Sequence, residues 1–510
     1  MEEGSTPNAA GPADVPPPAN NDRQPEDADG QDYWRMMIMK LKDKGELDEA
    51  VEQPLDPTGA FNHELLSDYF KKLAQIPAYV PRRGELVIFT LEGLKNGWLM
   101  SNDNGHFELF GYDNKWHGAP YWRAGVVIGT PDEDTQELDI IEKPVNSRGL
   151  GYPGFSLEIL PDPLSGQLFS MFIDDIPLRD IRPFNAWQIF LQGQDRHQQD
   201  PSIEDAMAVM SSHSTVHQYH IVGKGEDCRV HCKGIFVGAE LLAVSDTIRL
   251  EPESTQCYNL RTFKPAMITD VMVIEQISLP MKGIVDHDIV QLVKDCVPLI
   301  SGRVYTLDPK RVATSRLFPD PTADNSPTPL TANEAKAVFR QDEISDYGPW
   351  YRMAQGRICE VTPSAVVGRC YEPLAAEMMF ETSDLNYDLR GVWEGRRFSE
   401  QVYSDMPAGK TWLWGDSRVE KLVLPESDIE TAPQYEDPKK WGAVIGMERV
   451  ESSHKSSYEL QCEAEISEAS SSASSSSDES SDESGGDDDK DLSELFGDAL
   501  TESDSMDELA

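Results

Sequence analysis

The chain has 510 residues, of which 90 are acidic and 45 are basic, so its formal net charge is −45 at neutral pH. Each phosphate contact needs a local cation, so this balance excludes nucleic-acid binding through bulk positive charge, and it equally excludes a basic membrane-surface protein. No apolar run reaches the ~18 residues that span a bilayer, the first residues lack a signal-peptide pattern, and the 7 cysteines are scattered. We therefore expect a soluble intracellular protein with no membrane partner.

Two helices are predicted at the start of the ordered part, within a helical lead-in over residues 32–78. Residues 33–47 are rich in methionine. Residues 62–76 carry apolar side chains at helical spacing after Asn62, which is a suitable N-cap.

The hydrophobic period then changes to two, which is typical of β-strands. We predict a first β module over residues 79–200, with strands at 84–90, 123–129, 137–142 and 176–182. A helical connector over 201–233 follows, because Ser202 and Asp205 have the spacing of a capping box.

A second β domain is predicted over residues 234–380. Its strands are expected at 235–250, 270–277, 303–307, 356–361 and 366–369. Thr331 and Glu334 form a second capping box, which predicts a short helix inside this domain. An extension over 381–449 should pack on the core.

The two ends are predicted to be disordered, over residues 1–31 and 450–510. The last 60 residues hold 19 acidic and 2 basic residues, and 470–484 is almost wholly Ser, Asp and Glu. Two interpretations stay open, a solubilising tail and an interaction tail for histones or other basic partners that also carries phosphorylation sites. Leu492, Leu495, Phe496 and Leu500 favour the interaction tail, because their spacing suits a segment that folds on a partner.

The predicted fold class is therefore mainly β with peripheral helices (α+β). It consists of two small antiparallel β-barrel-like modules followed by a disordered acidic tail.

Catalytic motifs are missing from the sequence, which predicts a protein that is not an enzyme and uses no cofactor. There is no nucleophile elbow and no phosphate-binding glycine loop. The best metal candidates are His217, His220, Cys228 and Cys232, whose spacing could close a tetrahedral zinc site. We favour no metal, because Cys232 leads into an apolar run in which a cysteine behaves as a small hydrophobe.

Aromatic residues are concentrated near the first β block. Rings at a strand edge can form a cage for methylated lysine, whereas rings in a small domain can equally fill its core. Both interpretations stay open for the candidate binding residues Trp98, Tyr112, Trp116, Tyr121 and Trp122, and for Trp350 and Tyr351 in the second block.

Some arginines are candidate phosphate contacts despite the acidic balance, because salt limits the reach of the acidic tail to about 10 Å. These are Arg82, Arg83, Arg123, Arg396 and Arg397. The alternative for each is an ordinary solvated surface residue.

Read in order, the chain resembles the fungal cryptic loci regulator family, which includes the transcription-silencing subunit of a chromatin-remodelling and histone deacetylase repressor complex. The segments that carry the resemblance are YVPRRGELVIF (79–89), WRAGVV (122–127), PLRDIRPFNAWQ (177–188), AMAVMSSHS (206–214), CKGIFVGAELLAVSDTIRL (232–250), TDVMVIEQI (269–277), VVGRCYEP (366–373) and KTWLWGDSRVE (410–420).

The resemblance implies a bromo-adjacent homology (BAH)-like domain over 234–380 and a Tudor-like or methyl-binding-like module before it. It also implies a nuclear, chromatin-associated silencing factor that catalyses nothing. The expected partners are histone deacetylase and chromatin-remodelling subunits, and nucleosomes or histones, with weak DNA or RNA contact. The alternative function is a stand-alone histone chaperone or reader that uses the acidic tail.

Overall fold

The computed structural model describes residues 33–51, 63–92, 94, 97–143, 151, 153–160, 171–252, 267–284, 293–295, 297–314, 327–340 and 342–405. All of them lie in the first of two compact units, Met1–Gln461, and the second unit is Cys462–Ala510. Both ends that are predicted to be disordered, and the segment 410–420, lie outside the described residues.

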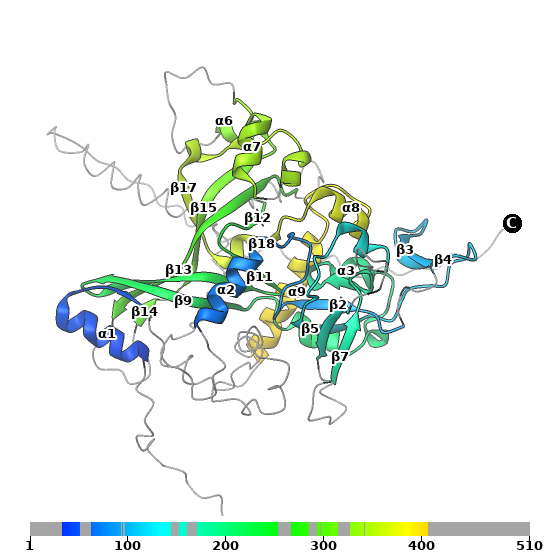
Figure 1. Cartoon of the computed structure of the whole chain (residues 1–510), viewed down its shortest axis with the longest axis horizontal. Helices are drawn as coiled ribbons and strands as arrows, with labels where there is room; N and C mark the ends of the chain where they lie inside the picture. Colours follow the sequence, from blue (N-terminus) through cyan, green and yellow to red (C-terminus); the bar gives the residue numbers. More distant parts are fainter. Residues whose placement is uncertain are drawn as a thin grey trace, which may run out of the picture. The chain divides into compact units, whose positions relative to one another are not determined.

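An antiparallel sheet of 11 strands forms the larger part of the fold (Figure 1). The main path of this sheet is β1-β9-β10-β13-β12-β18, and β11, β14, β15, β16 and β17 pair beside it. Its strands are β1 (Glu46–Ala50), β9 (His213–Lys224), β10 (Asp227–Val237), β11 (Glu240–Ala243), β12 (Thr247–Leu250), β13 (Asp270–Ile284), β14 (Val293–Asp295), β15 (Leu299–Thr306), β16 (Tyr351–Arg352), β17 (Ile358–Val361) and β18 (Val366–Arg369).

A second antiparallel sheet has 5 strands in the order β7-β6-β5-β2-β8. They are β2 (Leu86–Phe89), β5 (Arg123–Gly129), β6 (Phe155–Ile159), β7 (Met171–Ile176) and β8 (Ile181–Pro183). A separate hairpin, β3 (Gly97–Ser101) with β4 (Phe107–Gly111), forms a third sheet of 2 strands.

The prediction of a mainly β, antiparallel fold with peripheral helices is confirmed. The expected barrel shape is not found, because the pairing of the described strands leaves each sheet open rather than closed into a ring.

Helices lie at the edges of the sheets. They are α1 (Tyr33–Lys44), α2 (His63–Leu73), α3 (Trp187–Phe190), α4 (Ser202–Met207), α6 (Pro309–Thr314), α7 (Ala332–Val338), α8 (Pro373–Phe380) and α9 (Leu389–Asp405). Short 3-10 helices join them: η1 (Glu137–Ile140), η2 (Leu178–Asp180), η3 (Phe184–Ala186), η4 (Arg196–Gln198), η5 (Asp342–Tyr347), η6 (Ala354–Gly356) and η7 (Pro363–Ala365). No helix in the described part of the chain is long and apolar enough to cross a membrane.

Four local predictions differ from the structure. Residues 176–182 are predicted as one strand, but β7 ends at Ile176 and η2 (Leu178–Asp180) separates it from β8. Residues 137–142 are predicted as a strand but form η1, where the backbone N–H of Gln136 donates to Asp139 Oδ2 at 2.9 Å. The expected helical connector over 201–233 is helical only in α4, and from His213 onward it forms β9 and most of β10. Ser202 does not cap α4, because its hydroxyl donates to Asp200 at 2.6 Å. The capping box of Thr331 and Glu334 is confirmed.

One large core connects the two sheets. It contains Val87, Ile88 and Phe155 from the 5-stranded sheet together with Val271 and Val367 from the 11-stranded sheet. A second core lies between α1 and the long strands β10 and β13, and α2 covers a smaller one. The two predicted β modules therefore share buried apolar surface.

Candidate interaction site

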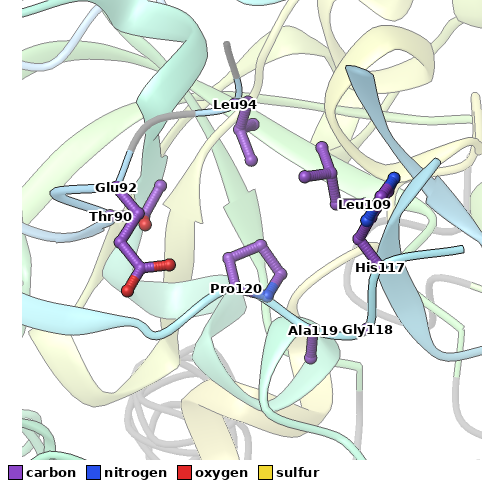
Figure 2. Close-up of a pocket in the computed structure, with 8 residues that line it drawn as sticks. All are labelled: Thr90, Glu92, Leu94, Leu109, His117, Gly118, Ala119 and Pro120. Atoms are coloured by element: carbon purple, nitrogen blue, oxygen red, sulfur yellow. The ribbon is translucent and has the colours of Figure 1, made fainter. Parts of the chain in front are cut away.

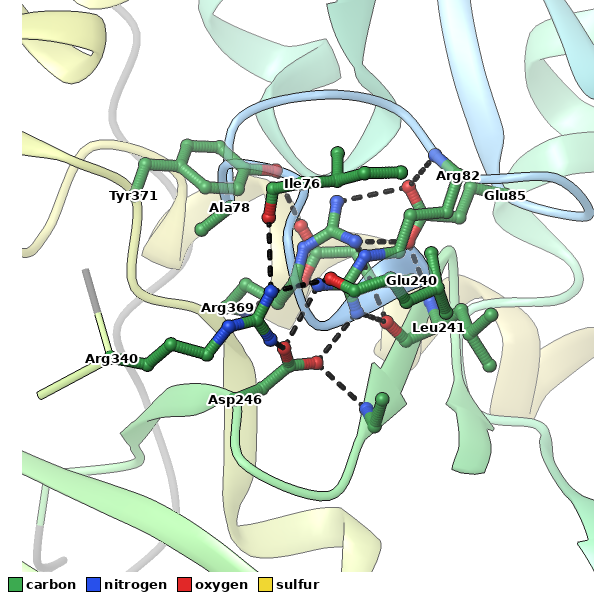
Figure 3. A network of polar contacts seen from close by, with 12 residues as sticks. Ile76, Ala78, Arg82, Glu85, Glu240, Leu241, Asp246, Arg340, Arg369 and Tyr371 are labelled. Atoms are coloured by element: carbon green, nitrogen blue, oxygen red, sulfur yellow. Dashed lines mark hydrogen bonds and ion pairs between the residues drawn. The ribbon is translucent and has the colours of Figure 1, made fainter. Parts of the chain in front are cut away.

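Buried ion pairs join segments that are far apart in the sequence. Arg82, which precedes β2, donates to both carboxylate oxygens of Asp246 at 2.6 and 2.9 Å, and the two side chains are 0% and 2% exposed. Arg369 in β18 makes the same two-pronged contact with Glu85, at 2.6 and 2.9 Å. Figure 3 shows these four side chains gathered in one cluster. The ion pairs therefore tie the segment before β2 to the turn between β11 and β12 and to strand β18 of the large sheet.

Glu240, Tyr371 and Arg340 complete this cluster. The hydroxyl of Tyr371 donates to Glu240 Oε1 at 2.5 Å, and the backbone N–H of Arg369 donates to Glu240 Oε2 at 2.7 Å. Arg340 lies 3.5 Å from Asp246 (Figure 3). It also donates to the carbonyl oxygen of Leu73 at 2.5 Å. Hydrogen bonds of this kind offset the large cost of removing charges from water.

Burial and charge act in opposite directions on these acids. Burial raises the pKa of Glu85, although the nearby Arg369 and Arg82 oppose the effect. Burial alone would also raise the pKa of Asp246, but the charge and hydrogen bonds of Arg82 outweigh it, so that pKa is lowered. We conclude that these charges hold the fold together.

A second buried pair joins β12 to the segment before α9. Arg249 donates to both oxygens of Asp388 at 2.6 and 2.8 Å, and both side chains are 0% exposed. The guanidinium of Arg249 also lies 4.0 Å from the centre of the Tyr387 ring. This pair fixes the start of α9 against the large sheet.

The predicted phosphate-binding arginines come from separate elements. Arg82 is 1% exposed and both of its terminal nitrogens donate to Asp246, so its contact with phosphate is not supported. Arg396 in α9 donates to the carbonyl oxygens of Ser364 and Val366. Its contact with phosphate is therefore not supported.

The remaining arginines are more accessible. Arg123 lies 3.2 Å from Asp200 in an ion pair. Arg83 is half-buried before β2, and Arg397 is exposed in α9. For these three residues phosphate contact stays a prediction.

The four candidate zinc ligands do not converge. Cys228 and Cys232 lie in the core beneath α1, and burial raises the pKa of their thiols to about 11 and about 12. His220 is on the opposite face of the sheet, where it pairs with Asp48 at 2.7 Å, and His217 stacks on Phe70. No cluster of three or more His, Cys, Asp or Glu side chains that could hold a metal occurs among the described residues.

The two most buried candidate tryptophans fill the core. Trp122 is 1% exposed and packs against Phe190 with ring centres 5.5 Å apart. Trp350 is also 1% exposed, packs against Phe339 and donates to the carbonyl oxygen of Ile344 at 3.0 Å. Their burial supports the interpretation that these two rings fill the core, and not the interpretation that they form a cage for methylated lysine. Tyr351 is half-buried in β16.

Trp98 lies on the outer side of the β3–β4 hairpin, and Tyr112 and Trp116, which follow β4, contact the rings on that side. The register pairs Trp98 with Phe110 and Leu99 with Leu109, so these two pairs point to opposite sides. We call the exposed group the aromatic face. It consists of Trp98 (44% exposed), Met100 (41%), Tyr112 (57%) and Trp116 (45%), together with Phe110.

The rings of the aromatic face contact one another. The centres of Trp98 and Tyr112 are 4.6 Å apart, and those of Phe110 and Trp116 are 5.0 Å apart. Glu108 shares this side of the hairpin, because its register partner is Met100. Large apolar side chains that stay together in water are typical of surfaces that bind a partner.

Turn residues and a buried anchor hold the hairpin in place. Asn102 accepts from the backbone N–H groups of Asn104 and His106, and Gly105 adopts a left-handed φ of 79°. On the inner side, Phe107 packs against Phe190 with ring centres 5.1 Å apart. The aromatic face is therefore carried on a supported element.

Tyr121 lies in the segment that leaves this region and enters β5. Its hydroxyl donates to Asp200 at 3.1 Å, and the guanidinium of Arg123 lies 5.6 Å from its ring centre. The ring is 46% exposed. Binding of a partner by Tyr121 stays a prediction.

A small pocket lies on the inner side of the hairpin, with a volume of about 180 Å³. We call it the hairpin pocket. In Figure 2, Thr90 and Glu92 lie across the pocket from Leu109 and His117. The rest of its lining is Leu94, Gly118, Ala119 and Pro120.

Sequence reasoning missed both the buried ion pairs and this pocket. A signal for the ion pairs was present, because Glu85, Glu240, Asp246, Arg249 and Arg369 each interrupt a segment of apolar, strand-like sequence. Charged residues at such positions are rarely buried unless they are paired. No comparable signal marks the pocket, which depends on segments brought together by folding.

Comparison with known proteins gives a family match and a likeness to a solved structure. Residues 231–372 match the family model described as "Transcription-silencing protein Clr2". The described segments of the resemblance at 232–250, 269–277 and 366–373 lie largely inside this match, so the resemblance to the family is confirmed there. No curated protein matches.

A solved structure titled "Structure of Clr2 bound to the Clr1 C-terminus" aligns with 15% sequence identity and a TM-score of 0.32. The alignment covers 67% of this chain and 65% of that one, so it spans less than two thirds of the solved chain.

Proposed function

We propose, from the premise that residues 231–372 are a Clr2-family segment, that this chain is a non-enzymatic, chromatin-associated transcription-silencing factor in the nucleus. The observation that carries the proposal beyond the family match is the aromatic face. Four of its side chains, on the β3–β4 hairpin and in the segment that follows it, are more than 40% exposed, and the hairpin is anchored to the core. Such a surface suits binding rather than catalysis.

In this proposal the chain links nucleosomes to a histone deacetylase repressor complex that also contains remodelling subunits. Catalysis belongs to the partner, and the chain raises the effective concentration of the enzyme at its substrate. The BAH-like domain over 234–380 would contact the nucleosome, and the module over 79–200 would carry the aromatic face. The buried ion pairs support this arrangement, because they hold the two segments in one rigid framework.

A stand-alone histone chaperone is the second candidate, and the net charge of −45 favours it. An acidic chain attracts basic histones through its long-range field, and this attraction weakens as salt rises. Its defining segment is the acidic tail over 450–510. A chaperone should lose its histones when the tail is deleted, whereas a silencing scaffold should keep its complex.

The test is affinity purification of the tagged full-length chain and of the tail deletion from nuclear extract, followed by mass spectrometry. A deacetylase and a remodelling ATPase recovered with both forms would support the scaffold. An eluate that holds only histones, and loses them with the tail, would sink the scaffold and leave the chaperone.

A further inference from the structure

We propose that the hairpin pocket binds the side-chain ammonium of a lysine in an extended basic peptide. The inference rests on the proposed binding function and names the chemistry of the group that is bound. It concerns the inner side of the hairpin, whereas the aromatic face lies on the outer side. The two surfaces can therefore be tested separately.

An unused hydroxyl is the first observation. Thr90 follows β2, is 1% exposed, and its Oγ1 is buried without a hydrogen-bond partner among the described residues. Its backbone is already fixed, because its N–H donates to the carbonyl oxygen of Asp180 at 3.1 Å. A buried hydroxyl without a partner costs stability, so a ligand that donates to it would recover that cost.

Charge is the second observation. Glu92 is an exposed carboxylate in the pocket lining, where the other titratable side chain is His117. His117 Nε2 is 3.0 Å from Asp113 Oδ1, so a second acid balances the imidazole. A ligand that binds to both Glu92 and Thr90 therefore needs several hydrogen-bond donors and a positive charge. An ammonium has three donors and no acceptor.

Shape is the third observation. Leu94, Leu109 and Pro120 supply apolar walls, and Figure 2 shows them placed around the pocket between the polar groups. A lysine side chain combines an aliphatic stem with a charged head, which matches apolar walls that end at a carboxylate. The volume of about 180 Å³ is enough for one such side chain. The acidic charge of the whole chain further favours a basic peptide.

The test uses the purified full-length protein and a Gly-Ser peptide with one central lysine, titrated by ligand-observed NMR. The neutral probe is the same peptide with norleucine, which keeps the stem and lacks the ammonium. We expect the lysine peptide to bind at least about tenfold more tightly than the norleucine peptide. Equal binding of the two peptides would overturn the proposal.

Two substitutions locate the binding. Glu92→Gln should weaken binding of the lysine peptide about three- to tenfold, and Glu133→Gln, an exposed glutamate outside the pocket, should leave it unchanged. Thr90→Val should weaken binding while the melting temperature stays the same or rises, because valine has the same shape and removes the unpaired hydroxyl. Equal effects of the two glutamate changes would refute the site.

A third substitution separates this inference from the proposed function. Trp98→Ala on the aromatic face should leave lysine-peptide binding unchanged, even if it abolishes recovery of the partner complex. Loss of lysine binding in Trp98→Ala, or tighter binding of a trimethyl-lysine peptide than of the lysine peptide, would assign the ligand to an aromatic cage and overturn the pocket.

Discussion

Replacement of Arg249 by methionine tests whether the buried charges hold the fold. Methionine keeps the length of the side chain and removes its charge. The Asp388 carboxylate, which is 0% exposed, would then lose both of its hydrogen bonds from Arg249, of 2.6 and 2.8 Å. Removing one member of a buried pair costs about 3–5 kcal/mol, because the remaining charge is left unpaired away from water.

The structure places the expected loss near the middle of that range. The carbonyl oxygen of Arg369 would lose its bond from Arg249 Nε but keep one from the Tyr387 hydroxyl at 3.1 Å. The carbonyl oxygen of Leu385 loses the 3.0 Å bond from Arg249. We therefore expect Arg249→Met to lower the free energy of unfolding by about 4 kcal/mol. This is a large share of the roughly 5–15 kcal/mol that stabilises an ordinary domain.

Urea unfolding of the full chain, followed by tryptophan fluorescence, measures this loss. The matched control is Arg390→Met, because Arg390 pairs with Glu394 on the surface and is 70% exposed. The control should change stability by less than about 0.5 kcal/mol. The double change Arg249→Met/Asp388→Leu should recover about 2 kcal/mol of the loss, since no buried charge is then unpaired. A loss below about 1 kcal/mol for Arg249→Met, or strict additivity in the double variant, would refute the reasoning.

Three further predictions follow from burial. Trp350→Ala should lower the free energy of unfolding by about 3–5 kcal/mol and Trp98→Ala by less than about 1 kcal/mol, measured by the same unfolding, and similar losses would contradict the assignment of Trp98 to the surface. Burial, together with the nearby His220 and Arg229, lowers the pKa of His231 below 6.5, so the unfolded chain binds more protons and stability falls as pH drops below about 6.5. His231→Gln should therefore reduce the stability difference between pH 7.5 and 5.5 by up to about 1 kcal/mol, and an unchanged difference would count against this role. Alkylation at pH 8 should modify Cys359 before Cys370, because burial raises the pKa of Cys370 to about 12, and peptide mapping that finds the reverse order would be inconsistent with the core.

The sequence predicts correctly those helices and strands that have a clear hydrophobic period within their own residues. The prediction for α2 rested on helical spacing of apolar residues, and β5 was predicted at residues 123–129, which the structure confirms. The prediction of a strand over residues 137–142 is wrong, because its apolar residues do not form one buried face. Leu138 and Ile141 are 53% and 37% exposed. The Asp139 carboxylate instead caps the start of η1, where it accepts from the backbone N–H of Gln136 at 2.9 Å.

Long-range pairing decided the elements that the sequence did not predict. Strand β9 carries polar residues at many positions, and its partners β1 and β10 supply its hydrogen bonds from both sides. The residues of the candidate site could not be predicted for the same reason, because their exposure depends on strand pairing and packing. The exposed side chain of Trp98 and the buried side chain of Trp122 cannot be told apart by composition, because register and packing decide which ring reaches water.

The most direct measurement of the central claim is the deacetylase activity that co-purifies with the chain when the aromatic face is removed. Tagged wild-type protein, Trp98→Ala/Trp116→Ala and the control Phe172→Ala would be recovered from nuclear extract in equal amounts. Phe172 is 49% exposed on β7, so its loss removes an exposed ring outside the aromatic face. The account predicts activity with the wild type and the control, and at least about a tenfold loss in the double variant. Equal activity from all three, or none from the wild type, would contradict it.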